Sequence, residues 1–210
     1  ETVGSMRGET NEGWIVFDHS NRKVSVRTYG DFNEANARFA LRGIEAMGFK
    51  LKENWIEFSR LSRRQSIKYL SPNLRVLEDY AHHPEEIKAL LSSLRAIFEG
   101  HKITALFQPH LYTRTRDFAD EFAEALDLAD EVLLMDIYPA REKPIKGVGS
   151  ELILEKMHLK KKSLCSKVDV IEELDEKDLD ILVTIGAGDI DQLVEPIKIL
   201  LSTKYEISEN

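Results

Sequence analysis

The sequence predicts an α/β protein in which helices cover both faces of a mostly parallel β-sheet, a three-layer arrangement. From residue 74 onward, short apolar runs alternate with segments whose apolar residues recur at helical spacing. Polar clusters also fall where two of these apolar runs end. Strands that alternate with helices are joined by right-handed crossovers, so such a sheet is buried on both sides.

The first sixty residues differ from the alternating part and predict a small, separate arrangement. The expected elements are strands at 14–18 and 24–27 around a turn at 19–22, a helix at 33–47 and a short helical piece at 55–61. Gly48 is typical of the residue that follows the last turn of a helix. This stretch is too short to hold a hydrophobic core alone.

In the alternating part, each expected strand is an apolar run and each expected helix carries an apolar stripe. Strands are expected at 74–78, 103–107, 131–137 and 181–185, helices at 85–98, 117–127, 150–157 and 190–201, and a short edge strand within 163–170. Pro84 suits the first position of a helix, and Glu85 and Glu86 complement the positive end of its dipole. Phe118 and Phe122 share one face of the helix that follows.

Polar side chains gather directly after two of the expected strands. Residues 78–84 place two imidazoles, two carboxylates and a phenol between a strand and a helix. Residues 108–117 add another imidazole, two guanidinium groups and several hydroxyls. Because open α/β sheets bind ligands at the carboxyl ends of their strands, we expect both clusters to converge at the ends of adjacent strands. Arginines and free backbone N–H groups at a helix start favour an anion such as a carboxylate or phosphate.

Composition argues against several classes of protein. The formal net charge of -8 disfavours nucleic acid or a membrane surface as a partner. Cys165 is the only cysteine, so no intramolecular disulfide can form, and a cytoplasmic location is expected. No apolar run reaches membrane-spanning length, and the amino terminus has no signal-peptide pattern.

Four segments, in their order along the chain, resemble the carboxy-terminal domain of the Mur ligases. They are residues 79–84, 107–117, 136–142 and 186–189. The resemblance is strongest to the members that add alanine, and it extends from about residue 60 to residue 200. It implies a Rossmann-like carboxy-terminal domain at 74–210, a hinge at 63–73 and, at 1–62, a fragment of the central ATP-binding domain.

The chain contains no Gly-x-x-x-x-Gly-Lys-Ser/Thr phosphate loop. The rest of the central domain and the amino-terminal domain of the family are expected to lie outside this sequence, so the fragment alone is expected to be inactive. By resemblance, the full-length enzyme uses ATP and Mg²⁺ to join L-alanine to UDP-N-acetylmuramate through an acyl phosphate. These small molecules are therefore the expected partners, and no metal site is expected within this chain.

The resemblance also assigns roles to individual residues. His82 and Arg114 are the expected catalytic residues, His82 by orienting the amine or the acyl phosphate and Arg114 by pairing with the alanine carboxylate. The expected substrate contacts are Tyr80, His110, Arg114 and Arg116, and the expected contacts to ATP are Asn33 and Asn36 at the adenine, Arg63 and Arg64 at the hinge, and Asp79 at the ribose.

Two positions depart from the family pattern. Phe32 replaces the histidine that precedes Asn33, which leaves an ordinary asparagine-capped helix as an alternative to an adenine contact. Leu111 replaces an arginine, and Arg116 is expected either to compensate for it or to pair with Asp120 one helical turn away.

Alternatives remain open for the site and for the function. By residue type, His82, His83 and His110 could bind zinc, although no fourth ligand with zinc-like spacing is evident. The position of His83 just before Pro84 favours a helix cap instead. For the function, the alternatives are a sister Mur ligase that adds another amino acid or a peptide, and a non-catalytic domain that keeps the fold.

Overall fold

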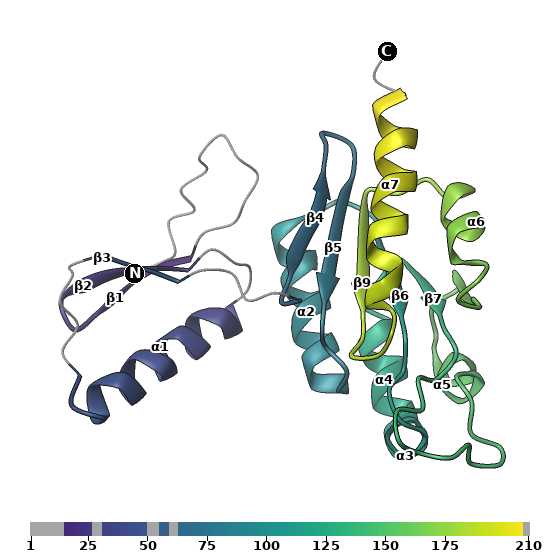
Figure 1. The fold of residues 1–210 in the computed structure, drawn as a ribbon, viewed down its shortest axis with the longest axis horizontal. Coiled ribbons are helices and arrows are strands. Elements are labelled where there is room, and N and C mark those ends of the chain that lie inside the picture. The colour runs from purple at the N-terminus through teal and green to yellow at the C-terminus, as the bar shows by residue number, and fades with distance from the viewer. Residues whose placement is uncertain (1–14, 27–30, 50–54, 59–62, 208–210) are drawn as a thin grey trace. The chain divides into compact units, whose positions relative to one another are not determined.

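The computed structural model describes residues 15–26, 31–49, 55–58 and 63–207, and it divides the chain into two compact units (Figure 1). Unit 1 comprises residues 1–62 and unit 2 comprises residues 63–210. In the described part of the chain each unit has a sheet of its own.

Unit 1 combines a small sheet of order β1-β2-β3 with one long helix. Its described elements are β1 (Ile15–His19), β2 (Arg22–Val26), α1 (Asp31–Ala46) and β3 (Trp55–Phe58). β1 and β2 pair antiparallel through Ser20 and Asn21, whose φ angles of 46° and 62° suit the twist of a tight hairpin. The predicted hairpin and helix are confirmed, and Gly48 follows α1 with φ 83°.

The helical piece predicted at 55–61 is wrong. Trp55–Phe58 forms β3, which pairs parallel to β2, while residues 59–61 lie outside the described part of the chain. A helical piece of seven residues makes barely two turns, and the nucleation of so short a helix is unfavourable. The edge of β2 instead supplies hydrogen bonds to an extended segment rich in aromatic and β-branched side chains.

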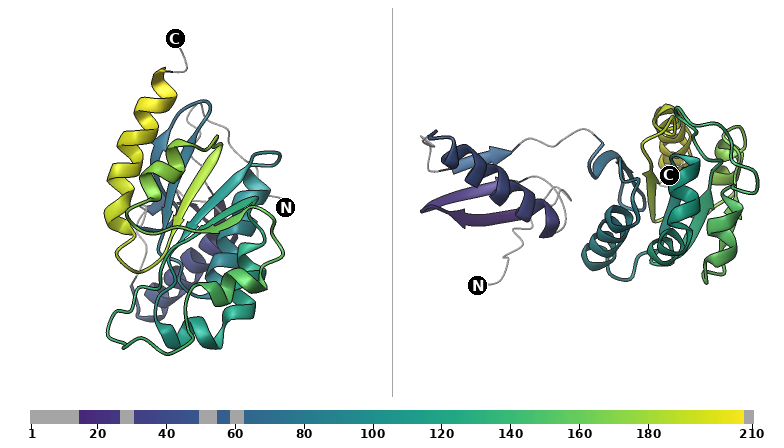
Figure 2. Two further views of the ribbon diagram at one scale, coloured as in Figure 1. Left: turned by 90° about the vertical axis from the view of Figure 1, so that its right-hand side faces the viewer. Right: turned by 90° about the horizontal axis from the view of Figure 1, so that it is seen from below.

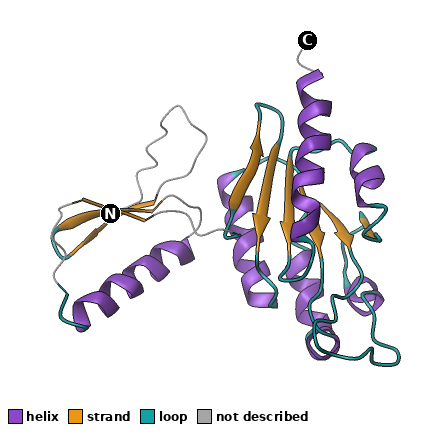
Figure 3. Ribbon diagram, in the orientation of Figure 1, coloured by secondary structure: helices purple, strands orange, loops and turns teal. Residues whose placement is uncertain are grey.

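Unit 2 is built on a mostly parallel sheet, whose strands are orange in Figure 3. The order of the strands is β4-β5-β9-β6-β7-β8. Its strands are β4 (Ser66–Leu70), β5 (Arg75–Asp79), β6 (Ile103–Phe107), β7 (Glu131–Leu134), β8 (Lys162–Leu164) and β9 (Ile181–Ile185). Every neighbouring pair is parallel except β4 and β5. The predicted α/β class with a mostly parallel sheet is confirmed.

Helices cover both faces of this sheet, which gives the predicted three layers (Figures 1 and 2). The helices of one face are α2 (Pro84–Ile97), α4 (Ala119–Leu126) and α5 (Glu151–Lys156), and those of the other are α6 (Val170–Asp175) and α7 (Asp191–Ile207). Leu106 and Leu182 of the sheet belong to the same buried cluster as Ile197 of α7. On the α4 side, the ring centroids of Phe107 and Phe122 lie 5.5 Å apart. The central strands are thus buried on both faces, as their continuous apolar runs indicate.

Several segments of unit 2 differ from the expected boundaries, among them β7, which ends at Leu134, and α7, which continues to Ile207. The helix expected at 117–127 is present as α4, while α3 (Tyr112–Asp117) precedes it and was not predicted. The stretch 163–170 overlaps the edge strand β8, but α6 follows it and was not predicted. Residues 66–70, assigned to a hinge by resemblance, form β4, the antiparallel edge strand of the sheet.

Candidate functional site

The candidate site lies at the carboxyl ends of β5, β9 and β6. Two backbone hydrogen bonds tie these strand ends together, from the Gly186 N–H to the Asp79 carbonyl (3.1 Å) and from the Gln108 N–H to the Ile185 carbonyl (3.0 Å). β5 and β6 were expected to be adjacent, but β9 lies between them. The polar clusters that follow β5 and β6 therefore meet across the turn that follows β9.

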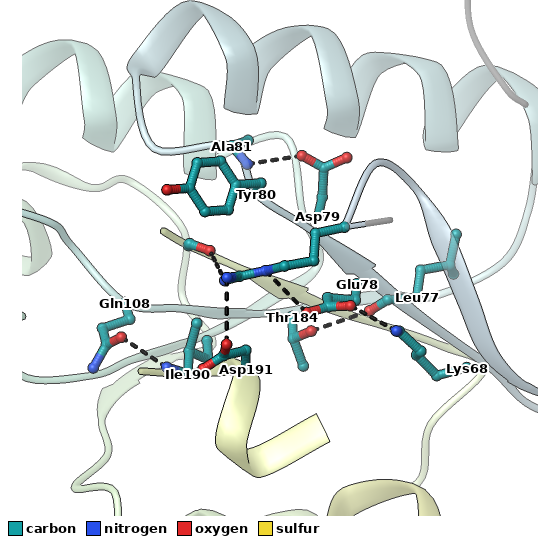
Figure 4. Close-up of polar contacts among 12 residues, drawn as sticks. Lys68, Leu77, Glu78, Asp79, Tyr80, Ala81, Gln108, Thr184, Ile190 and Asp191 are labelled. Carbon is teal, nitrogen blue, oxygen red and sulfur yellow. Dashed lines mark hydrogen bonds and ion pairs between the residues drawn. The ribbon is translucent and has the colours of Figure 1, made fainter. Parts of the chain in front are cut away.

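Asp79 shapes the turn that presents Tyr80 and His82. Its two carboxylate oxygens accept hydrogen bonds at 2.8 Å, one from the backbone N–H of Gln65 and the other from that of Ala81, which Figure 4 shows. The side chain is buried, and burial raises the pKa of Asp79 above its ordinary value, although both N–H groups act in the opposite direction. Because both of its carboxylate oxygens accept hydrogen bonds from the backbone, the Asp79 side chain holds this turn in its conformation.

Four of the predicted site residues come together at this edge. The ring centroids of Tyr80 and His82 lie 5.4 Å apart, and those of His82 and His110 lie 6.1 Å apart. Arg114 donates a long hydrogen bond of 3.4 Å to the carbonyl of His82. Tyr80, His82, His110 and Arg114 are all partly exposed, so a small ligand can reach them.

His110 is held in place from the β7 side of the site. Its ring stacks on Tyr138 with the centroids 5.7 Å apart, and the two residues form an isolated parallel bridge. Burial, together with the charges of Arg114 and His82, lowers the pKa of His110. Its Nδ1 is buried and has no hydrogen-bond partner among the described residues. His110 therefore tends to be neutral and has an unused polar atom.

Arg114 is carried by α3, whose start is capped from a distant loop. Leu111 precedes the helix with φ 75°, and the Glu142 carboxylate accepts a hydrogen bond from the Thr113 N–H at 3.0 Å. The hydroxyl of Thr113 donates to the same carboxylate. Because this cap comes from Glu142, 29 residues away in sequence, the local sequence of α3 did not predict a helix.

Arg116 does not join the four converging residues. It is exposed and pairs with Asp117 at 2.7 Å, so the pairing expected with Asp120 is wrong. Asp120 pairs instead with Lys156 at 2.6 Å. Because α3 ends at Asp117, Asp120 does not follow Arg116 by one turn of the same helix. The guanidinium of Arg116 pairs instead with the adjacent carboxylate of Asp117.

The two arginines assigned to the hinge differ in their surroundings. The Arg63 guanidinium lies 3.2 Å from the Glu78 carboxylate, donates to the Gly186 carbonyl at 3.0 Å, and lies 4.6 Å from the Tyr80 ring centroid. Arg64 is exposed, and its guanidinium has no hydrogen bond or ion pair within the described ranges. Arg63 is thus part of the domain structure, whereas Arg64 is available to a ligand.

The turn after β9 lets neighbouring groups approach closely. A Cβ on Gly188 would lie 2.4 Å from Gln108 Oε1 and 2.7 Å from Tyr138 Cβ. The Gln108 side chain crosses this turn. It donates to Asp189 Oδ1 at 2.8 Å and accepts from the Ile190 N–H at 3.0 Å, the second of which Figure 4 shows. The turn at 186–189 is thus tightly packed, and the bridging role of Gln108 was not predicted from the sequence.

The remaining expected nucleotide contacts belong to unit 1. Asn33 and Asn36 both lie in α1, and the side chain of Asn36 is exposed. The side chain of Asn33 lies outside the described part of the structure. The adenine contact therefore stays a prediction.

No group of three histidine, cysteine, aspartate or glutamate side chains within the described ranges could hold a metal ion. Of the histidines considered for zinc, His83 is the N-cap residue of α2, and its ring packs 5.0 Å from the Phe118 ring. The described residues therefore do not fit a bound Mg²⁺ or Zn²⁺.

A hollow of about 790 Å³ lies elsewhere on unit 2. It is lined by the loops that precede β6, β7 and β8, including Lys102 and Lys161, and by Arg95 of α2. These loops are at the amino ends of the parallel strands, so this hollow is separate from the candidate site. Among the helices of the described ranges, none has the length and apolar character needed to cross a membrane.

Comparisons with known proteins identify related chains. Residues 62–190 match the family model described as Mur ligase, glutamate ligase domain. A UDP-N-acetylmuramate–L-alanine ligase from Cytophaga hutchinsonii is 40% identical over 202 residues, which are 92% of this chain and 43% of that protein. The chain thus spans less than half the length of this relative.

Two solved structures share the fold. The UDP-N-acetylmuramate-alanine ligase of Thermotoga maritima aligns with a TM-score of 0.68 and 26% identity, over 94% of this chain and 44% of that one. A MurF ligase from Thermotoga maritima in complex with ADP aligns with a TM-score of 0.63 and 15% identity, over 92% of this chain and 45% of that one. At this identity the second likeness shows the fold alone.

Proposed function

Since this chain belongs to the Mur ligase family, we propose that it is the carboxy-terminal portion of an ATP-dependent UDP-N-acetylmuramate:L-alanine ligase. In this role it binds the incoming amino acid and closes over ATP. The observation that carries the proposal is the convergence of Tyr80, His82, His110 and Arg114 at the carboxyl edge of the sheet. The relative that names alanine as its substrate supports the choice of amino acid.

The proposed site suits a small zwitterion. Arg114 supplies a guanidinium that pairs with the alanine carboxylate, which is a charge-assisted contact. His82 lies next to it and orients the amine toward the acyl phosphate, which the rest of the enzyme forms from ATP. The domain thereby contributes orientation and exclusion of water, two effects that lower the barrier of a reaction between two bound substrates.

The nucleotide contacts are a second part of the proposal. Arg64 is exposed beside the Asp79 turn, so it is the better candidate of the hinge pair for a phosphate or ribose contact. Asn33 and Asn36 are proposed to contact adenine from unit 1. Mg²⁺ would require ligands beyond those that the described residues provide.

The direct test uses the full-length protein that contains this chain. ADP release is measured with UDP-N-acetylmuramate and each amino acid in turn, and alanine is expected to give the highest kcat/KM. Arg114→Ala should lower kcat/KM for alanine by about thirty-fold to a thousand-fold, as expected for a loss of about 2 to 4 kcal/mol. The KM for ATP should change much less.

Arg116→Ala is the matched control, because Arg116 is exposed and already paired with Asp117. Equal losses in both variants would argue against an alanine carboxylate at Arg114. Higher activity with another amino acid or a peptide would identify a sister ligase. No ligation under any of these conditions would support a non-catalytic domain.

The isolated 210-residue chain should release no ADP, because its sequence has no phosphate loop to hold the γ-phosphate. The same assay tests this point, with Arg114→Ala as a check for contaminating enzymes. Turnover by the purified chain that disappears in this variant would contradict the proposed division of labour.

A further inference from the structure

Glu86 occupies an unusual position beside His82. It is the third residue of α2, and one of its oxygens, Oε2, accepts hydrogen bonds from the backbone N–H of His82 at 2.9 Å and of His83 at 3.3 Å. The same oxygen lies 3.5 Å from Nδ1 of the His82 ring. Burial raises the pKa of Glu86, but the His82 and His83 contacts outweigh it, and the pKa lies below its ordinary value.

The surroundings of His82 define which ring nitrogen carries a proton. Nδ1 lies 3.0 Å from the carbonyl oxygen of Tyr80 and 3.5 Å from the carboxylate of Glu86. Carbonyl and carboxylate oxygens only accept hydrogen bonds, so Nδ1 must be the donor. In the neutral ring, the lone pair is then on Nε2.

Nε2 remains available for chemistry. No hydrogen bond to this atom is present within the described ranges, and the His82 side chain is 26% exposed. The ring is also the one that lies between Tyr80 and His110 at the edge of the sheet. A lone pair on a partly exposed ring nitrogen, in a ring held by its other nitrogen, is the arrangement of a proton acceptor.

We propose that Glu86 is a positioning residue that, with the Tyr80 carbonyl, fixes His82 as the Nδ1–H tautomer and so makes Nε2 the proton acceptor for the incoming amine. This inference rests on the proposed ligase function. The ammonium group of alanine transfers one proton to Nε2, and its freed lone pair attacks the acyl carbon to form the C–N bond. The C–O bond to phosphate then breaks, phosphate leaves with the bonding electrons, and the second nitrogen proton goes to solvent. The Glu86 carboxylate stabilises the imidazolium formed.

The tautomer can be measured on the 210-residue chain without any activity. Long-range ¹H–¹⁵N correlation spectra of the labelled protein distinguish a protonated Nδ1 from a protonated Nε2, and His82→Gln assigns the signals. The neutral ring is expected to be the Nδ1–H form in the wild type. Observation of the Nε2–H form would overturn the proposal, whatever activity the full-length protein has.

Glu86→Ala should reduce the fraction of the Nδ1–H form, since only the Tyr80 carbonyl then holds Nδ1. Glu85→Ala is the matched control, because Glu85 lies in the same helical turn but is exposed. It removes an equal charge near the helix start and should leave the tautomer unchanged. An identical response in both variants would show that Glu86 acts only through the helix.

A second readout separates positioning from loss of structure in the full-length enzyme. Glu86→Ala should lower kcat with alanine on the order of ten- to a hundred-fold. Hydroxylamine, whose nitrogen is uncharged at neutral pH, needs no such base, so its reaction with the acyl phosphate should be nearly unaffected. Equal losses with alanine and hydroxylamine would overturn the positioning role. If the wild type ligates nothing, the proposed function fails, while the tautomer measurement still stands.

Discussion

Arg63→Ala is expected to destabilise unit 2, and Arg64→Ala is not. The Arg63 guanidinium lies 3.2 Å from Glu78, whose side chain is only 6% exposed, and donates to the Gly186 carbonyl at 3.0 Å. It also lies over the Tyr80 ring at 4.6 Å. The neighbouring Arg64 is exposed and makes no comparable contact within the described ranges. The two variants therefore remove the same side chain from different surroundings.

The magnitude follows from what each contact of Arg63 contributes. A hydrogen bond to a charged group is worth about 1.5 to 3 kcal/mol, and a cation over an aromatic ring adds about 0.5 to 1 kcal/mol. Lys68, 2.8 Å from Glu78, still neutralises the buried carboxylate after the substitution, which limits the loss. We therefore expect the free energy of unfolding of unit 2 to fall by about 2 to 4 kcal/mol in Arg63→Ala. In Arg64→Ala it should stay within about 0.5 kcal/mol of the wild-type value.

Thermal unfolding followed by two signals gives the measurement. The tryptophans, Trp14 and Trp55, both belong to unit 1, so their fluorescence follows that unit, while far-UV circular dichroism follows the helices of both. Arg63→Ala should lower the Tm seen by circular dichroism by about 5 to 12 °C and change the fluorescence transition little. Equal Tm values for Arg63→Ala and Arg64→Ala would refute the structural assignment of Arg63.

Three further outcomes test other parts of unit 2. Gly188→Ala should cost about 1 to 3 kcal/mol in urea unfolding, because its Cβ would lie 2.7 Å from Tyr138 Cβ; wild-type stability would show that the turn yields without strain. Burial raises the pKa of Cys165 to about 11, so iodoacetamide should modify it only after unfolding, and rapid modification of the folded chain would contradict its burial. Burial raises the pKa of Glu131, but two lysines lower it below 4.5 overall, so its contribution to stability is present above pH 4.5 and is lost as the pH falls through the folded-state pKa. Glu131→Gln should therefore weaken the acid dependence of the Tm, and an unchanged dependence would contradict this ion pairing.

The strands of unit 2 could be predicted because their burial leaves a direct mark on the sequence. β6 and β9 are buried at every position, so each consists of consecutive apolar or small residues. α3 and β3 leave no such mark. α3 begins where the Glu142 carboxylate caps Thr113, and β3 exists through its pairing with β2, so partners distant in sequence decide both. Local pattern alone cannot supply that information.

The features of the site also divide into those that the sequence reveals and those that depend on partners distant in the sequence. Tyr80, His82, His110 and Arg114 could be found because each follows a recognisable strand and carries a functional group. The motifs did not distinguish side chains that face a ligand from side chains whose polar atoms are used inside the domain. Asp79 illustrates this difference, because its carboxylate is engaged by two backbone N–H groups. Such engagement depends on the fold of Gln65 and Ala81, which no pattern around Asp79 reveals.

The turn after β9 explains how two clusters from non-adjacent strands form one site. Neighbouring strands lie about 4.8 Å apart, so the ends of β5 and β6, with β9 between them, are separated by about twice that distance. Side chains that follow β5 and β6 can meet only if the turn after β9 does not fill the space between them. Gly188 has no Cβ, and Gln108 and Tyr138 occupy the space that a Cβ would need. Tyr138 in turn stacks on His110, whose ring then lies 6.1 Å from that of His82. The glycine turn is therefore as necessary to the site as the residues that carry its chemistry, because it sets the distance between them.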